Sequence, residues 1–128
     1  MYCLDTTFLV DVTRARGGAA ERAKAFAREH EDLSAPAPAI AEVLVGANYR
    51  GEETLRRTLE MVAALEVLPV DLDVTGAAGR LGADMLRRGT PLMGVDLLVA
   101  ATALHHRRVL VSRDTIFPRV PGLTVETY

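Results

Sequence analysis

Short apolar segments alternate with longer amphipathic segments along the whole chain, and this alternation limits the folds that the sequence can adopt. The short segments are rich in Val, Leu and Ala, and they are brief enough to be buried strands. We expect strands over residues 1–4, 33–35, 67–70, 109–111 and 123–126. The longer segments carry apolar residues at helical spacing, and we expect helices over 6–14, 19–31, 38–48, 52–65, 71–88 and 95–105. Strands that alternate with helices predict an α/β fold with a short, mostly parallel central sheet.

Length and composition agree with a single domain over residues 1–128. Cys3 is the only cysteine, so no internal disulfide forms, and its apolar neighbours predict a buried, unreactive thiol. Asp5 interrupts the opening apolar run, which argues against a secretory signal. No segment approaches the roughly 20 apolar residues of a membrane span. We therefore expect a cytoplasmic protein without a membrane segment.

Four acidic residues stand where the predicted strands end or the following helices begin. Asp5 comes directly after the first strand, and Asp114 follows the strand at 109–111. Glu42 falls near the start of its helix, and Asp96 opens the apolar helix at 95–105. In parallel α/β sheets, sites form beyond the carboxyl ends of the strands, so we expect these four carboxylates to meet there.

Each of two helical acids also has a simpler explanation. Asp96 could cap its helix, and Glu42 could be a first-turn acid that the helix dipole favours. Taken one at a time, these explanations are as good as a ligand role. Both acids, however, lie within apolar runs, where an ionised carboxylate is costly unless it is paired or bound to metal. Together with Asp5 and Asp114, they favour a common site.

Clustered carboxylates repel one another, and a divalent cation removes that conflict. Oxygen ligands without His or Cys favour Mg²⁺ or Mn²⁺ over zinc. Asp5 and Asp96 are the first choice as direct metal ligands, with Glu42 and Asp114 binding directly or through water. A metal-bound water can attack a phosphodiester while the metal offsets the developing charge, so this set of carboxylates suits phosphodiester hydrolysis.

The segments that hold the four acids resemble the motifs of PIN domains, in the family's order and spacing. They are Leu4–Asp11, Ala41–Gly46, Gly94–Ala103 and Leu110–Asp114, the last followed by Phe117 and Val120–Leu123. The match covers essentially the whole chain and is closest to VapC-type toxins of VapBC toxin–antitoxin modules. The resemblance implies a PIN-like three-layer α/β/α sandwich, Mg²⁺- or Mn²⁺-dependent RNA cleavage, a homodimer, and inhibition by a cognate antitoxin.

The resemblance also suggests roles for individual residues. Asp5, Glu42, Asp96 and Asp114 occupy the family's acidic positions, which would make all four catalytic. Thr7 matches a small polar position where Ser or Asn is common, and it would orient Asp5 or a metal-bound water. Ser112 matches a hydroxyl position where Thr is common. No carboxylate is missing, so we expect an active enzyme.

Arginine supplies every basic residue except Lys24, and its planar fork suits phosphate. We expect some of the following arginines to form a basic patch for RNA and the rest to be solvated: Arg14, Arg16, Arg50, Arg56, Arg57, Arg87, Arg88, Arg107, Arg108, Arg113 and Arg119. The resemblance implies tRNA or rRNA as substrate, and single-stranded loops are where sequence-specific RNA recognition usually works.

Other functions remain open at this point. A haloacid-dehalogenase-like phosphatase needs a second Asp two residues after the nucleophile, where Thr7 stands, and a receiver domain needs a lysine near the acids, whereas Lys24 lies in another segment. A PIN-domain ribonuclease outside a toxin–antitoxin module, or a PIN-like module that binds RNA or protein without turnover, fits the same residues. Asp11 is expected to be a solvated or edge residue of the first helix. His105 and His106 are expected to serve a helix dipole.

Overall fold

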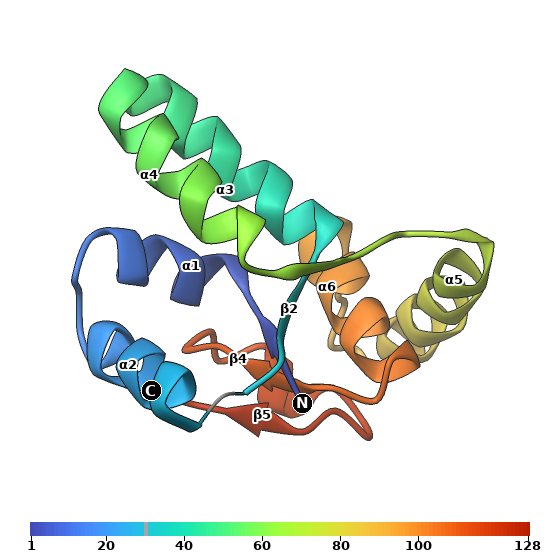
Figure 1. Ribbon diagram of the computed structural model, residues 1–128. Helices are drawn as coiled ribbons and strands as arrows, with labels where there is room; N and C mark the ends of the chain where they lie inside the picture. Colours follow the sequence, from blue (N-terminus) through green and yellow to red (C-terminus); the bar gives the residue numbers. More distant parts are fainter. Residues whose placement is uncertain (30) are drawn as a thin grey trace.

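The computed structural model of the chain describes residues 1–29 and 31–128 (Figure 1). Its strands are β1 (Tyr2–Leu4), β2 (Leu33–Pro36), β3 (Glu66–Leu68), β4 (Val109–Val111) and β5 (Val125–Glu126). Its helices are α1 (Thr6–Thr13), α2 (Ala19–Glu29), α3 (Ala37–Arg50), α4 (Glu52–Ala63), α5 (Leu72–Arg87) and α6 (Gly94–His105), with a short 3₁₀ turn at Phe117–Arg119. The α/β fold predicted from the alternating pattern is confirmed.

The strands form one sheet in the order β3-β2-β1-β4-β5, and all neighbouring strands are parallel. From β1 the chain first builds outward through β2 and β3, and it then returns to add β4 on the other side of β1. The strand order therefore reverses between β1 and β4. In open parallel sheets this reversal leaves a crevice beyond the carboxyl ends of the two strands, where ligands bind. Asp5 and Asp114 follow these two strands.

The two faces of the sheet are covered by different helices, which gives three layers (Figure 1). Because side chains alternate along a strand, Cys3 and Leu110 lie in one core cluster while Leu4 and Val111 lie in the other. The first cluster is completed by residues of α5 and α6, and the second by residues of α1, α2 and α3. The expected three-layer α/β/α arrangement is confirmed, and so is the buried Cys3, whose thiol pKa burial raises to about 12.

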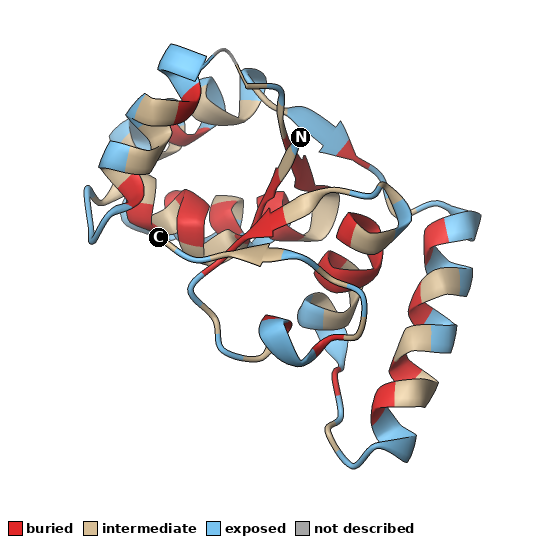
Figure 2. Cartoon of the chain, turned by 90° about the horizontal axis from the view of Figure 1, so that it is seen from below, coloured by how far each residue is buried: buried red, intermediate tan, exposed pale blue. Residues whose placement is uncertain are grey.

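Helix α6 is largely buried within its layer, in agreement with its apolar sequence. Its residues from Val99 to Ala103 are all buried. Helix α5 packs along it with a single buried stripe, which Figure 2 shows as red segments on one side of the helix. Gly82 belongs to this stripe, and a Cβ added there would lie 3.1 Å from Leu97 Cδ2. The two helices therefore approach closely where a glycine allows it.

Helices α3 and α4 form a hairpin that extends beyond the sheet, above α1 in Figure 1. Gly51 joins them with φ +121°, a conformation that glycine adopts without the strain of a side chain. The ends of some elements differ from those expected. Strand β3 begins at Glu66 and ends at Leu68, because Pro69 has no N–H to continue the ladder. In the part of the chain that the structure describes, no helix is long and apolar enough to cross a membrane.

Candidate active site

Asp5 is buried at the carboxyl end of β1, where the chain turns into α1. Only 3% of its surface is exposed. Its Oδ2 accepts hydrogen bonds from Ser112 Oγ at 2.7 Å and from Thr7 Oγ1 at 3.0 Å. Burial raises the pKa of Asp5, and these two hydroxyls offset part of that rise. The structure thus brings together the acid and both hydroxyl residues that the sequence indicated, with Thr7 oriented toward the carboxylate.

The loop after β4 is tied to the same centre. Ser112 is buried, and besides donating to Asp5 it accepts a hydrogen bond from the backbone N–H of Asp114 at 3.1 Å. Asp114 Oδ1 in turn accepts from the backbone N–H of Ile116 at 3.0 Å. One hydroxyl therefore links the two acids that follow the central strands, because it contacts the side chain of one and the backbone of the other.

Glu42 lies on α3 and reaches α1, where its Oε1 accepts a hydrogen bond from Thr6 Oγ1 at 2.8 Å. We expected Glu42 within the first helical turn, but α3 begins at Ala37 and its first turn holds no acidic residue. Pro36 ends β2 and the helix follows it at once, so Glu42 falls in the second turn. The helix dipole acts mainly within the first turn and does not account for this position.

Asp96 lies in the first turn of α6 and is not its N-cap. The N-cap residue is Met93, because Gly94, with φ +62°, already begins the helix. The capping explanation for Asp96 is therefore wrong. Burial raises the pKa of Asp96, and the negative charges of Asp114, Asp5 and Glu42 raise it further. Asp96 thus lies close enough to the other three predicted acids for their charges to act on it.

The four carboxylates form a loose acidic centre and not a closed cage. Among residues 1–29 and 31–128, no three acidic, histidine or cysteine side chains stand close enough together to enclose a metal ion. Mg²⁺ fits such a centre, because it keeps several of its waters and uses one or two carboxylates together with phosphate oxygens. The residues present suit an oxygen-coordinated cation held largely through water.

Sequence reasoning placed Asp11 wrongly on a solvated face or edge. Asp11 is 2% exposed, and its carboxylate pairs with Arg113 and accepts a hydrogen bond from Tyr128 Oη at 2.8 Å. The hydrogen bond from Arg113 lowers the pKa of Asp11. No local pattern could have shown this cluster, because its members come from α1, the loop after β4 and the end of the described chain.

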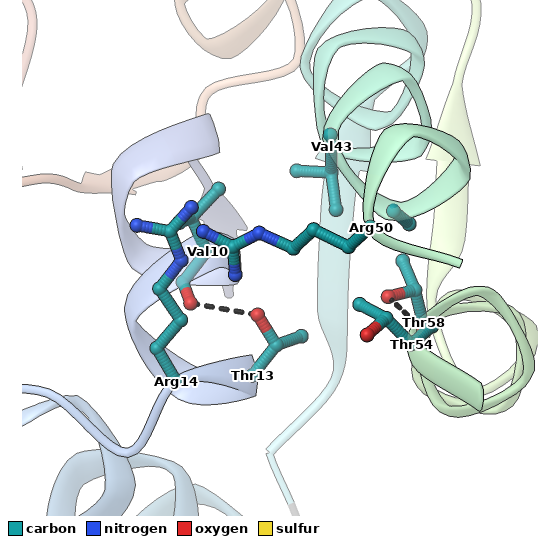
Figure 3. A pocket seen from close by; sticks show the side chains of 9 residues that line it. Val10, Thr13, Arg14, Val43, Arg50, Thr54 and Thr58 are labelled. Atoms are coloured by element: carbon teal, nitrogen blue, oxygen red, sulfur yellow. Dashed lines mark hydrogen bonds between the residues drawn. The ribbon is translucent and has the colours of Figure 1, made fainter. Parts of the chain in front are cut away.

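The arginines divide into those with acidic partners and those without. Ion pairs within the described residues hold Arg22, Arg56, Arg57, Arg88, Arg108 and Arg113. Arg14 and Arg50 have no ion pair to a described residue, and both line a pocket between α1 and the α3–α4 hairpin (Figure 3). The basic patch expected from the sequence stays a prediction, and this pocket is where two of its arginines meet.

Comparison with known proteins agrees with the fold. A family model for the PIN domain matches residues 2–123. The chain is 28% identical over 92 residues to the tRNA(fMet)-specific endonuclease VapC of Salmonella typhimurium, and the match covers 70% of each protein.

Two solved structures share the fold over nearly their whole length. The first is VapBC2 from Rickettsia felis bound to a promoter DNA fragment, with TM-score 0.86 and 21% identity over 99% of this chain and 98% of that one. The second is DNA-bound VapBC from Salmonella typhimurium, with TM-score 0.82 and 24% identity over 98% and 96%. These two likenesses show the fold, and the match to the Salmonella endonuclease VapC bears out the resemblance to VapC-type proteins. Because the family model spans almost all of the sequence, the chain belongs to the PIN domain family.

Proposed function

We propose that this protein is an endoribonuclease that uses Mg²⁺ or Mn²⁺ to hydrolyse RNA phosphodiester bonds, and that it is the toxin of a type II toxin–antitoxin pair. The observation that carries the proposal is that Ser112 joins Asp5 and Asp114 where the strand order reverses, with Asp96 near enough for the charges of Asp114, Asp5 and Glu42 to raise its pKa. Four acids with no basic residue among the causes of that shift form a site that favours a divalent cation and the phosphate it brings.

Each side chain has a role in this proposal. Asp5, fixed by Ser112 and Thr7, and Asp96, at the start of α6, would hold the cation directly. Glu42, oriented by Thr6, and Asp114 would bind directly or through water. A cation bound there supplies a water of lowered pKa and offsets negative charge on the phosphate.

The fixed position of Asp5 matters most for this chemistry. Both hydroxyl donors reach the same oxygen, Oδ2, so the plane of the carboxylate is set before any ligand arrives. An active site that is already oriented does not have to reorganise when substrate binds, and this lowers the barrier. Ser112 and Thr7 therefore position the acid without touching the substrate.

The similar proteins suggest the substrate and the partner. One relative is named for cleavage of tRNA(fMet), so tRNA is the first substrate to test, with rRNA as the alternative. The structural neighbours are complexes named VapBC, which supports a cognate antitoxin as partner. We also propose a homodimer, because the outer face of α3 exposes Val45 and Tyr49 to 72% and 92%.

Two narrower alternatives remain within the family. A PIN-domain ribonuclease outside a toxin–antitoxin pair would share the site and lack the antitoxin. A module that binds RNA or protein without turnover would have no need for four clustered acids, whose mutual repulsion is costly. The intact acidic set therefore favours an active enzyme.

The experiment is cleavage of a tRNA(fMet) transcript by the purified protein with Mn²⁺ and with EDTA. Asp5→Asn and Asp96→Asn are each expected to lower the rate by at least about a hundredfold, since each removes charge from the site. Asp73→Asn is the matched control, because Asp73 is an exposed acid in the first turn of α5, as Asp96 is in α6. Calorimetry should show Mn²⁺ binding to the wild type and the control that is lost in Asp96→Asn. Equal binding by all three proteins would remove Asp96 from the metal site.

A further inference from the structure

The pocket in Figure 3 brings two arginines together from different helices. Arg14 follows the last residue of α1, and Arg50 is the last residue of α3. Figure 3 shows their side chains reaching toward each other from opposite walls, and Val10 and Val43 also line the pocket. Neither arginine has an acidic partner among the described residues, whereas Arg56 on the adjacent helix α4 is paired with Glu53 and Glu60.

The donors of this pair are not used within the described protein. Arg14 Nε is buried and has no hydrogen-bond partner there. A buried donor without a partner costs free energy, and two guanidinium groups that face each other repel. The nearby hydroxyls do not relieve this, because Thr13 donates to the carbonyl of Val10 and Thr58 to that of Thr54. An anion between the two arginines would relieve both costs.

The two helices that form the walls of the pocket, α1 and α3, also carry Thr6 and Glu42. On α3, Arg50 lies about two turns beyond Glu42. On α1, Arg14 lies two turns beyond Thr6, whose hydroxyl bonds to Glu42. Eight residues of helix span about 12 Å, so the arginine pair stands about that far from Glu42 along each helix.

The surface of α3 is open at Gly46, between Glu42 and Arg50. Gly46 stands one turn from both Glu42 and Arg50 on α3, and it is exposed. A Cβ added at Gly46 would meet no atom within 4 Å. Gly46 therefore leaves room on α3, between Glu42 and Arg50, for a polymer with regularly spaced negative charges.

We propose that Arg14 and Arg50 jointly bind one backbone phosphate of the RNA, a nucleotide or two from the bond that is cut. This proposal rests on the proposed function, because it requires that the RNA strand bound at the acidic centre continues along α3 to the pocket. Arginine binds phosphate through parallel N–H donors, and such contacts position a nucleic acid without reading its sequence. The pocket lies between the same two helices that carry Thr6 and Glu42, and this favours RNA over an acidic segment of a protein partner.

The position of the two arginines at helix ends needs a control. Basic residues near a helix C-terminus stabilise it through the dipole, whatever else they bind. Arg87 is also the last residue of its helix and is exposed, at the end of α5. Arg87→Gln therefore matches Arg50→Gln in net charge and in helix position, but it lies outside the pocket.

The test measures binding of fluorescein-labelled tRNA(fMet) and of labelled oligouridylate by anisotropy in EDTA, where no cleavage occurs. Arg14→Gln and Arg50→Gln should each weaken binding of both RNAs by about tenfold, since a hydrogen bond to a charged group is lost. The plot of log affinity against log salt should lose a slope of about 0.7, which corresponds to one phosphate on a single strand. The double variant should be little worse than either single variant, because the two arginines share one ligand. Arg87→Gln should bind like the wild type, and thermal melts should show that all variants fold.

Each outcome decides a separate point. If the wild type cleaves tRNA with Mn²⁺ but the pocket variants bind both RNAs normally, the phosphate site is wrong and the proposed function stands. If the wild type neither binds nor cleaves RNA, both fail. If the variants bind RNA normally but lose affinity for a polyglutamate peptide that the wild type binds, the pair serves a protein carboxylate and the RNA proposal is overturned. Arg50→Lys should recover part of the affinity, because charge is restored without the fork.

Discussion

Replacing Asp5 with Asn should stabilise the metal-free protein while it abolishes metal binding. Burial of Asp5 costs several kcal/mol when it is ionised, and the hydrogen bonds from Ser112 and Thr7 return about 1.5–3 kcal/mol each. The raised pKa of Asp5 shows that the cost of burial exceeds this return. Asn keeps an acceptor for the hydroxyls without the charge, so a gain on the order of 1 kcal/mol is expected at neutral pH.

The raised pKa of Asp5 determines how the difference in stability between the two proteins changes with pH. A carboxyl whose pKa is raised by folding adds stability below its unfolded pKa and loses it as the pH rises through the folded value. Between about pH 4 and pH 7, wild-type stability should therefore fall relative to that of Asp5→Asn. A gain of about 1 kcal/mol corresponds to a rise in Tm of about 3–5 °C in a chain of this length.

Thermal melts in EDTA and in Mn²⁺ provide the assay. In EDTA at neutral pH the Asn variant should melt above the wild type. At about a hundred times its Kd, Mn²⁺ should stabilise the wild type by about 2.7 kcal/mol and reverse the order. Asp73→Asn should follow the wild type in both buffers. The reasoning is refuted if Asp5→Asn is the less stable protein in EDTA, or if Mn²⁺ stabilises both proteins equally.

Two further substitutions test the supports of the site. Ser112→Ala removes the 2.7 Å hydrogen bond to Asp5 and the acceptor of the Asp114 N–H. Urea melts should show a loss of about 1–3 kcal/mol in the free energy of unfolding, and RNA cleavage should slow. Unchanged melts would show that neither hydrogen bond contributes to stability. Asp11→Asn should cost about 1 kcal/mol near pH 7, because Arg113 lowers the pKa of Asp11 and such a group adds stability above its unfolded pKa. That loss should shrink as the pH falls through the folded pKa, and a loss that is equal at both ends of the pH range would contradict it.

The sequence predicted the elements well because local periodicity determines them. The short apolar run at 109–111 predicted a strand, and the helical spacing of apolar residues in 95–105 predicted a helix. The four acids, which follow strands or begin helices, indicated the carboxyl edge of the sheet. The exact ends of helices depend on backbone conformation that the pattern does not show. Gly94, at φ +62°, begins α6 before Asp96, which moved that acid out of the capping position.

Contacts between distant segments could not be predicted in the same way. Asp11 looked like a surface acid because its partners, Arg113 and Tyr128, lie at the other end of the chain. The presence of Arg14 and Arg50 in one pocket likewise depends on how the α3–α4 hairpin packs against α1, which no sequence periodicity specifies. Residue type suggested arginines as phosphate ligands, but only the packing of the helices shows that these two share a pocket.

The negative charge of the acidic centre depends on which partners the neighbouring side chains bind. The groups that hold Asp5 are hydroxyls, which orient a carboxylate without neutralising it. Arg113 is adjacent to Asp114 in sequence and would lower the carboxylate pKa values if it turned inward, but the buried carboxylate of Asp11 binds its guanidinium instead. The only charges that shift the pKa of Asp96 are consequently negative ones. The pairing with Asp11 thus engages the guanidinium that follows Ser112 in sequence, and the proposed site keeps the uncompensated negative charge that would favour a divalent metal.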